Sequence, residues 1–140
     1  MMMSSNLERN LAISQLCKAI LATNESVFFV SSLNKNGKAI ESEFRNDRII
    51  TKMSKQETEM YFMQRTLQIS LSKEFDDLIG PLDFIIIQRE TLLEILFPYS
   101  EGILLVVCDL DVIPRFIGKK ISFMLRNFEL QLKSSLNAYA

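Results

Sequence analysis

The sequence predicts an α/β fold: a five-stranded, mostly antiparallel sheet with helices on both faces, in the order helix, two strands, helix, three strands, helix. Two observations lead to this prediction. Apolar residues recur at three- and four-residue spacings in three segments, as in amphipathic helices. Five shorter segments are rich in β-branched and aromatic residues and lie between turn-forming residues, as strands do. A chain of 140 residues is expected to form one domain, 1–140, with its core over about 7–132.

The first helix is predicted over residues 7–23, because apolar side chains there recur every three or four positions. One of Ser4, Ser5 and Asn6 is expected to cap its N-terminus, since these side chains accept hydrogen bonds from free helix amides.

A β-hairpin is predicted next, with strands over residues 27–30 and 38–44. Asn36 and Gly37 lie between them and tolerate the positive φ angles that a tight turn requires. The second strand is the more polar of the two, which suits a partly exposed edge. An irregular connector is expected over residues 45–53.

The middle helix is expected to begin with a capping box formed by Ser54 and Glu57. It is predicted to run to about Phe75 and to end before Gly80-Pro81. One stripe of the helix is apolar and is widened by neighbouring positions. The stripe is Met60, Met63, Leu67 and Leu71, and Tyr61, Phe62 and Ile69 widen it.

Three strands are predicted over residues 84–87, 92–97 and 103–108. The last of these is apolar for six residues without alternation, which predicts a central strand covered on both faces. Pro114 suits the first turn of a final helix, whose apolar positions run to Leu132.

Composition removes several classes of function. The net charge of −1 gives no broad field for nucleic acid. The absence of histidine removes the commonest general base and metal ligand, and no glycine-rich phosphate-binding motif occurs. Cys17 and Cys108 lie in apolar runs, which predicts buried, reduced thiols. The chain is therefore expected not to be an enzyme and to hold no cofactor or metal.

The N-terminal residues lack a basic segment followed by a long apolar one, and no run approaches 18 apolar residues. These features predict that the chain has no signal peptide and no membrane span, and that it is cytoplasmic.

Two small charged groups have alternative interpretations. Asp109 and Asp111 follow a strand and precede a helix, where aspartate caps or turns the chain; the alternative is Mg²⁺ bound together with substrate phosphates. Arg45 and Arg48 precede the capped middle helix, where they would contact an anion or ligand. The alternative for the arginines is pairing with nearby carboxylates.

The order of elements resembles the roadblock family, within the wider profilin-like and longin-like group. The resemblance rests on the strand at 27–30, the Asn36-Gly37 hairpin, the helix opened by Ser54 and Glu57, and the last strand ending in Asp109-x-Asp111, and it covers about residues 7–132. The run from Phe44-Arg45 to Gln64 also looks like a set of small archaeal proteins of unknown function.

The resemblance implies a homodimer in which the strand after the middle helix pairs with its copy and the middle helices meet across the dyad. It also implies a small GTPase or scaffold protein as partner. A hydrophobic strand over residues 84–87 would template such association if it lay at an edge. The predicted interface residues are Phe84, Ile85, Ile86, Ile87, Met60, Tyr61, Met63 and Leu67.

The alternative function is a small-molecule sensor with a pocket between sheet and helix. The pocket is predicted to be lined by Phe28, Phe44, Phe62 and Phe97, with Arg45 at its mouth.

Overall fold

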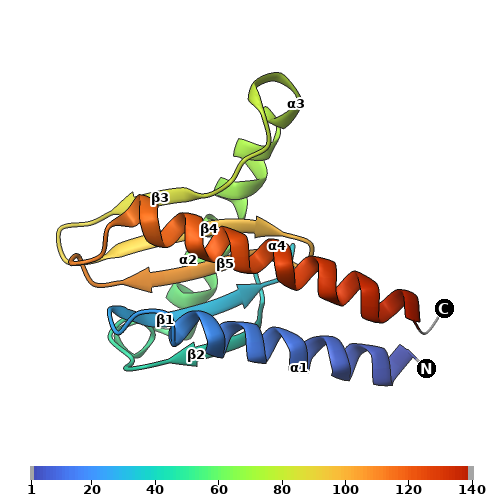
Figure 1. Cartoon of the computed structure of the whole chain (residues 1–140). Coiled ribbons are helices and arrows are strands. Elements are labelled where there is room, and N and C mark those ends of the chain that lie inside the picture. The colour runs from blue at the N-terminus through green and yellow to red at the C-terminus, as the bar shows by residue number, and fades with distance from the viewer. Residues whose placement is uncertain (1, 139–140) are drawn as a thin grey trace.

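The computed structural model describes the backbone of residues 2–138 and the side-chain surroundings of residues 6–134. Its strands are β1 (Val27–Leu33), β2 (Ala39–Phe44), β3 (Ile85–Gln88), β4 (Leu93–Tyr99) and β5 (Gly102–Cys108), and its helices are α1 (Met2–Leu21), α2 (Lys55–Lys73), α3 (Asp76–Ile79) and α4 (Pro114–Ala138). Within residues 2–138 the five strands form one antiparallel sheet in the order β2-β1-β5-β4-β3. Helices α1 and α4 cover one face and α2 covers the other, which confirms the predicted fold class (Figure 1).

Strand β5 lies at the centre of the sheet, as its unbroken apolar run predicts. Six of its seven residues are buried, because helices cover both faces there. The edges of the sheet are β2 and β3. The polar β2 edge, with Glu41, Ser42 and Glu43, agrees with the prediction of a partly exposed edge strand.

The β1–β2 turn uses one residue with positive φ where the sequence predicted two. Gly37 has a φ of 79°, and no other residue type in the described chain has a positive φ. The Asn34 side chain instead accepts hydrogen bonds from the backbone N–H groups of Asn36 and Lys38, at 2.9 and 3.0 Å. An Asx-type turn therefore replaces the second left-handed residue.

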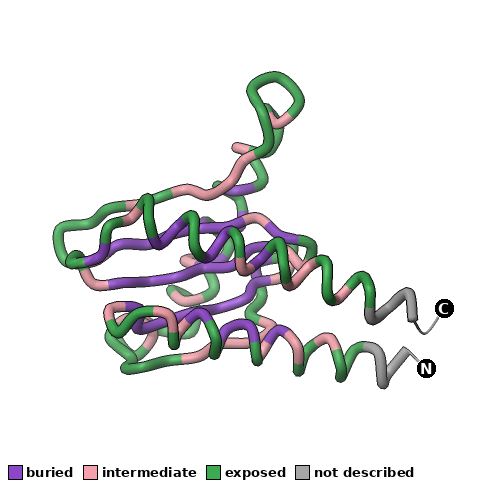
Figure 2. The backbone as a smooth tube through the Cα atoms, viewed as in Figure 1, coloured by how far each residue is buried: buried purple, intermediate pink, exposed green. Residues whose placement is uncertain are grey.

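The larger core lies between the sheet and the α1/α4 layer, where the inner sides of both helices and the strands are buried (Figure 2). Helix α1 contributes Ile13, Leu16, Cys17 and Ile20, and α4 contributes Ile117, Ile121 and Leu125. Leu7 and Leu11, which are among the recurring apolar positions that predicted a helix over residues 7–23, are exposed instead. Helix α1 also begins at Met2, so Ser4, Ser5 and Asn6 lie inside it and the prediction that one of them caps it is wrong.

Helix α4 approaches the start of β3 closely because position 118 is glycine. A Cβ atom at Gly118 would lie 2.7 Å from the Phe84 ring, inside van der Waals contact. The Phe84 ring in turn lies 5.7 Å from the ring of Phe97, measured between centroids. This face of the sheet is thus closed by tight apolar packing up to its β3 edge.

The smaller core lies between the sheet and α2. The predicted capping box is confirmed: the Ser54 hydroxyl accepts from the Glu57 N–H at 3.1 Å, and the Glu57 carboxylate accepts from the Ser54 N–H at 2.9 Å. From α2, Phe62 and Ile69 pack against strand residues on this face. The connector before α2 contains one 3₁₀ turn, η1 (Ile50–Lys52).

The link between α2 and β3 holds the short helix α3, which stands off the body of the molecule (Figure 1). The sequence predicted a single helix to about Phe75, whereas α2 ends at Lys73 and α3 begins at Asp76. No helix in the described part of the chain has both the length and the apolarity to cross a membrane.

Candidate protein-interaction surface

The outer side of α2 carries a stripe of large apolar side chains. Met60, Met63, Leu67 and Leu71 are each between 49% and 55% exposed. The same helix buries Phe62, Arg65, Thr66 and Ile69 against the sheet. Both sets follow helical spacing, so the inner side of α2 is occupied and the apolar stripe faces outward. A stripe of this kind, rich in methionine, suits contact with another protein.

The β3 edge is a second exposed feature of the chain. Strand β3 pairs with β4 on one side, and within the described chain no strand pairs with its other side. Ile86 is 39% exposed, while Ile85 and Ile87 are half-buried towards the α2 core. The edge therefore offers both unpaired backbone groups and apolar side chains, which favours strand addition.

The predicted interface residues divide into two groups. Met60, Met63, Leu67 and Ile86 are exposed, whereas Tyr61, Phe84, Ile85 and Ile87 are half-buried. Phe84 belongs to the α1/α4 side, where its ring packs beneath α4. The predicted residues of α2 thus lie on the opposite face of the sheet from Phe84, and β3 forms the edge of the sheet. That these residues meet a second subunit stays a prediction.

A buried charged cluster lies beneath the stripe. The Glu94 side chain in β4 is 1% exposed and accepts hydrogen bonds from three groups. The Arg65 Nε lies 2.7 Å from Glu94 Oε1, the Tyr61 hydroxyl lies 2.5 Å from the same atom, and the Arg89 Nε lies 2.9 Å from Oε2. The cluster therefore joins α2, the β3–β4 turn and β4 at a single carboxylate.

The hydrogen bonds keep this carboxylate ionised. Burial by itself would raise the pKa of Glu94, but the bonds from Arg65, Tyr61 and Arg89 outweigh it and lower the pKa below its usual value. Burial, and next the nearby charge of Glu94, raises the pKa of Tyr61, so its hydroxyl stays a donor. One carboxylate with two guanidinium groups leaves the cluster with one net positive charge.

Glu94, Arg65 and Arg89 were not among the predicted site residues. The signal for them lies in two patterns. Glu94 is a charge inside the apolar run 92–97, and Arg65 occupies a position three residues after Phe62 and four before Ile69, on the buried side of α2. A charge inside a buried strand requires a partner of opposite charge, and Arg65 is at the helical position that supplies it.

The two predicted ligand arginines are engaged within the chain. The Arg45 guanidinium donates to the backbone carbonyl of Leu21, the last residue of α1, at 2.5 Å, and to that of Val27, the first residue of β1, at 3.0 Å. The Arg48 guanidinium lies 2.5 Å from an Asp109 carboxylate oxygen and 3.7 Å from the centre of the Phe28 ring. Contact of either arginine with an anion stays a prediction.

The Asp109-x-Asp111 pair lies in the loop between β5 and α4. Asp109 makes the ion pair with Arg48, and Asp111 lies exposed in a turn, three residues before Pro114 opens α4. In the described chain, no three acidic or cysteine side chains gather closely enough to hold a metal ion. The arrangement agrees with the turn interpretation of this pair.

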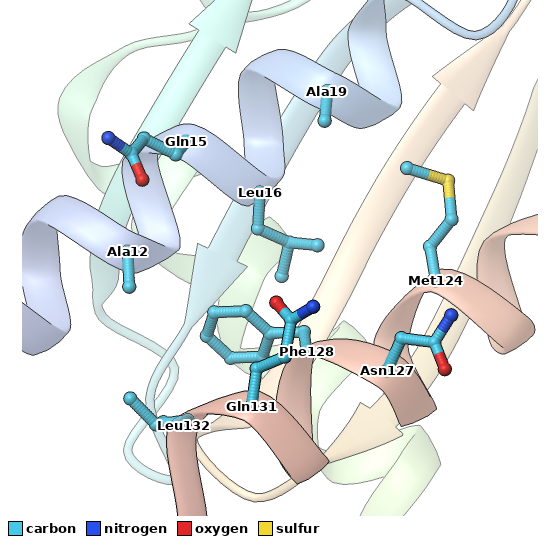
Figure 3. A pocket seen from close by; sticks show the side chains of 9 residues that line it. All are labelled: Ala12, Gln15, Leu16, Ala19, Met124, Asn127, Phe128, Gln131 and Leu132. Carbon is cyan, nitrogen blue, oxygen red and sulfur yellow. The ribbon is translucent and has the colours of Figure 1, made fainter. Parts of the chain in front are cut away.

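A second surface feature is a groove of about 430 Å³ between α1 and α4 (Figure 3). Leu16, Phe128 and Leu132 give it apolar walls, and the side-chain amides of Gln15 and Asn127 lie beside them. It is open to solvent along both helices.

The aromatic pocket of the alternative prediction does not form. Phe28 and Phe62 belong to the core on the α2 side, and Phe97 belongs to the core on the α1/α4 side, across the sheet. Phe44 stacks on Phe29, with 4.7 Å between ring centroids. Strand side chains alternate between the two faces of the sheet, so these aromatic residues cannot line one cavity, and this prediction is wrong.

Comparison with solved structures identifies the fold. The Roadblock/LC7 domain from Streptomyces avermitilis is similar with a TM-score of 0.64 and 10% identity, over 86% of this chain and 97% of that one. MglB from Myxococcus xanthus has a TM-score of 0.66 and 17% identity, over 89% and 92% of the two chains. An MglB with a tetrameric arrangement gives 0.59 and 10%, over 91% and 92%. No family model and no curated protein matches the sequence. The chain has the roadblock fold that the order of its elements predicts.

Proposed function

We propose that this chain is a homodimeric protein-interaction module that works with a small GTPase or a related scaffold protein, without catalysis of its own. One observation carries the proposal: the described chain leaves uncovered both an apolar stripe on α2 and the outer side of the edge strand β3. Large apolar side chains and free strand amides together are the features that a second protein covers.

A second copy of the same chain fits this surface by symmetry. Two β3 strands that run antiparallel across a two-fold axis satisfy each other's outer amides and carbonyls, and the same axis relates the two α2 stripes. Strand β3 has four residues, so strand pairing contributes few hydrogen bonds. The α2 stripe supplies the apolar area that a stable dimer requires.

The GTPase part of the proposal is supported by the roadblock resemblance and by the fold shared with Roadblock/LC7 and MglB structures. The non-catalytic part is supported by the chain's lack of histidine. It is also supported by the structural role of the charged cluster, whose carboxylate accepts hydrogen bonds from Arg65, Tyr61 and Arg89. The cytoplasm remains the expected compartment.

The first experiment is the solution mass, measured by light scattering behind size exclusion over a dilution series. We expect a mass of twice 16.2 kDa that falls towards the monomer on dilution. A monomer at every concentration would contradict the dimer.

The partner is tested with purified components. We expect the immobilised chain to retain a small GTPase from its own cell lysate, and the purified GTPase to bind differently in its GDP and GTP-analogue forms. Failure to bind any GTPase in either nucleotide state would contradict this part of the proposal and leave the dimer unaffected.

A further inference from the structure

The link between α2 and β3 forms an arm, residues 74–82, with unusually exposed apolar side chains. Leu78 is 79% exposed and Ile79 is 84% exposed, the two highest values among the large hydrophobic residues of the described chain. Phe75, at the base of α3, is 54% exposed. Exposure of this extent on adjacent aliphatic residues is costly in water, so a surface that covers them is expected.

The arm is held in a defined conformation. The Asp76 carboxylate accepts a hydrogen bond from the Leu82 N–H at 3.0 Å, and the Asp76 carbonyl accepts one from the Gly80 N–H at 3.0 Å. Directly after the arm, Asp83 is fixed to α4 by Lys119 at 2.8 Å and by the Ser122 hydroxyl. Contacts at both ends therefore keep the apolar residues away from the body.

The position of the arm indicates what covers it. Figure 1 shows α3 beyond the β3 side of the sheet, past the edge strand. Leu82, at the base of the arm, packs in the core on the α2 side, so the arm leaves the body on that side. The space beyond the β3 edge on the α2 side is where a second copy lies when two β3 strands pair.

Exposed apolar residues continue along the chain from α2 into the arm. Leu67 and Leu71 in α2 are followed by Phe75 and Leu78, and all four are exposed. In an antiparallel pair of β3 strands, the start of one strand lies beside the end of the other. Each arm, which precedes β3, is then directed to the partner residues that follow β3.

Charge favours the same partner. Glu74 and Asp77 are exposed on the arm. Arg89, directly after β3, keeps 56% of its side chain exposed while its Nε bonds to Glu94. The symmetry that pairs β3 with its copy brings the acidic arm of one subunit to the exposed guanidinium of the other.

We propose that the arm is part of the dimer interface and reaches across to the second copy of this chain, where Leu78 and Ile79 pack on the partner's α2 stripe. The inference rests on the proposed homodimer. In this arrangement, each subunit's arm adds a contact to those between the β3 strands and the α2 helices.

The test compares two double variants of the full chain. Leu78→Ser with Ile79→Ser removes the apolar contact of the arm, and Leu7→Ser with Leu11→Ser is the matched control, since Leu7 and Leu11 are 68% and 60% exposed on α1. We expect the arm variant to raise the dimer dissociation constant at least tenfold and the control to change it less than threefold. Urea unfolding of the monomers should match the wild type in both cases, because all four side chains are exposed.

Photo-crosslinking tests the contact directly. A photoreactive phenylalanine analogue replaces Ile79 in unlabelled protein, which is mixed with ¹⁵N-labelled wild-type protein. We expect crosslinked peptides that join an unlabelled arm to a labelled segment from α2.

The outcomes separate this inference from the homodimer. A dimeric wild type with an unchanged arm variant, or crosslinks within single chains only, would overturn the role of the arm and leave the β3–α2 dimer standing. An arm variant that keeps the dimer but loses a GTPase would overturn it too, because the arm would then serve another partner. A wild type that is monomeric at all concentrations would overturn both proposals.

Discussion

The two faces of the sheet are covered in different ways. On the α1/α4 face, two helices enclose an apolar core, and Gly118 lets α4 pack against Phe84 at the edge. On the α2 face, one helix covers a smaller core, encloses the carboxylate of Glu94, and leaves an apolar stripe outside. The two faces thus differ in the number of covering helices and in the buried charge, whereas both carry exposed apolar side chains, among them Phe116, Phe123 and Leu130 of α4. A second protein is expected on the α2 face.

The largest expected effect concerns the charged cluster of the α2 face. Glu94→Gln leaves Arg65 buried beside a neutral side chain, and we expect it to lower the free energy of unfolding by about 3–5 kcal/mol. Urea unfolding checks this, with Glu90→Gln as the control because Glu90 is exposed in the same hairpin. A loss below about 1 kcal/mol, comparable to a surface change, would mean that the cluster does not hold α2 to β4.

The same cluster predicts a dependence on pH. Because the folded pKa of Glu94 is lowered, its contribution to stability is present above its unfolded pKa of about 4.3 and is lost as pH falls through the folded value. The difference in unfolding free energy between wild type and Glu94→Gln should therefore shrink as the pH is lowered from about 5. Urea titrations at several acidic pH values measure it, and a constant difference would contradict a lowered pKa.

A smaller effect separates exposed leucines on the two faces. Leu67 in α2 is 53% exposed and Leu11 in α1 is 60% exposed. We expect Leu67→Ser to weaken dimerisation about tenfold, equivalent to about 1.4 kcal/mol, and Leu11→Ser to leave it unchanged. Sedimentation equilibrium measures both dissociation constants. Equal changes in the two dissociation constants would show that the α2 face contributes no more to dimerisation than the α1/α4 face.

The smallest effect tests how tightly the α1/α4 face is closed. In Gly118→Ala, the new methyl group meets the Phe84 ring, and overpacking of about 1–3 kcal/mol exceeds the helix-propensity gain of about 1 kcal/mol. We expect a net loss of about 1 kcal/mol in thermal or urea unfolding.

The sign of this effect should reverse in a Phe84→Ala background. There the methyl group meets no ring, and Gly118→Ala should stabilise the protein by about 1 kcal/mol through helix propensity. Destabilisation in both backgrounds would place the strain elsewhere than at Phe84.

Most of the fold could be predicted from the sequence because its elements carry strong local signals. The unbroken apolar run of β5 indicated a central strand, and Ser54 with Glu57 marked the start of α2. The positions of the exposed stripe and the β3 edge were also within reach, since both follow from periodicity and order. The start of α1 was not, because Ser4 to Asn6 suit a cap equally well when the helix continues through them.

The remaining features depend on contacts between residues distant in sequence. The Glu94 cluster unites residues 29 and 33 positions apart, and periodicity within one segment does not show such pairs. The predicted aromatic pocket was wrong for a related reason, because residue type alone does not say on which side of the sheet Phe97 lies. The arm was missed because the middle helix was predicted to run to about Phe75 and to end before Gly80-Pro81, with no further element in between. The structure has α3 there, and it carries Leu78 and Ile79 outward.

The two buried thiols of the α1/α4 core, Cys17 and Cys108, are natural reporters of local unfolding. Burial raises the pKa of Cys17 and of Cys108 to about 12, so both thiols stay protonated at pH 8, and neither side chain is exposed to reagents. Alkylation of either cysteine therefore waits for that layer to open, and its rate reports the opening. The kinetics of the closed face can thus be timed, alone or with a partner bound to the opposite face, without any introduced label.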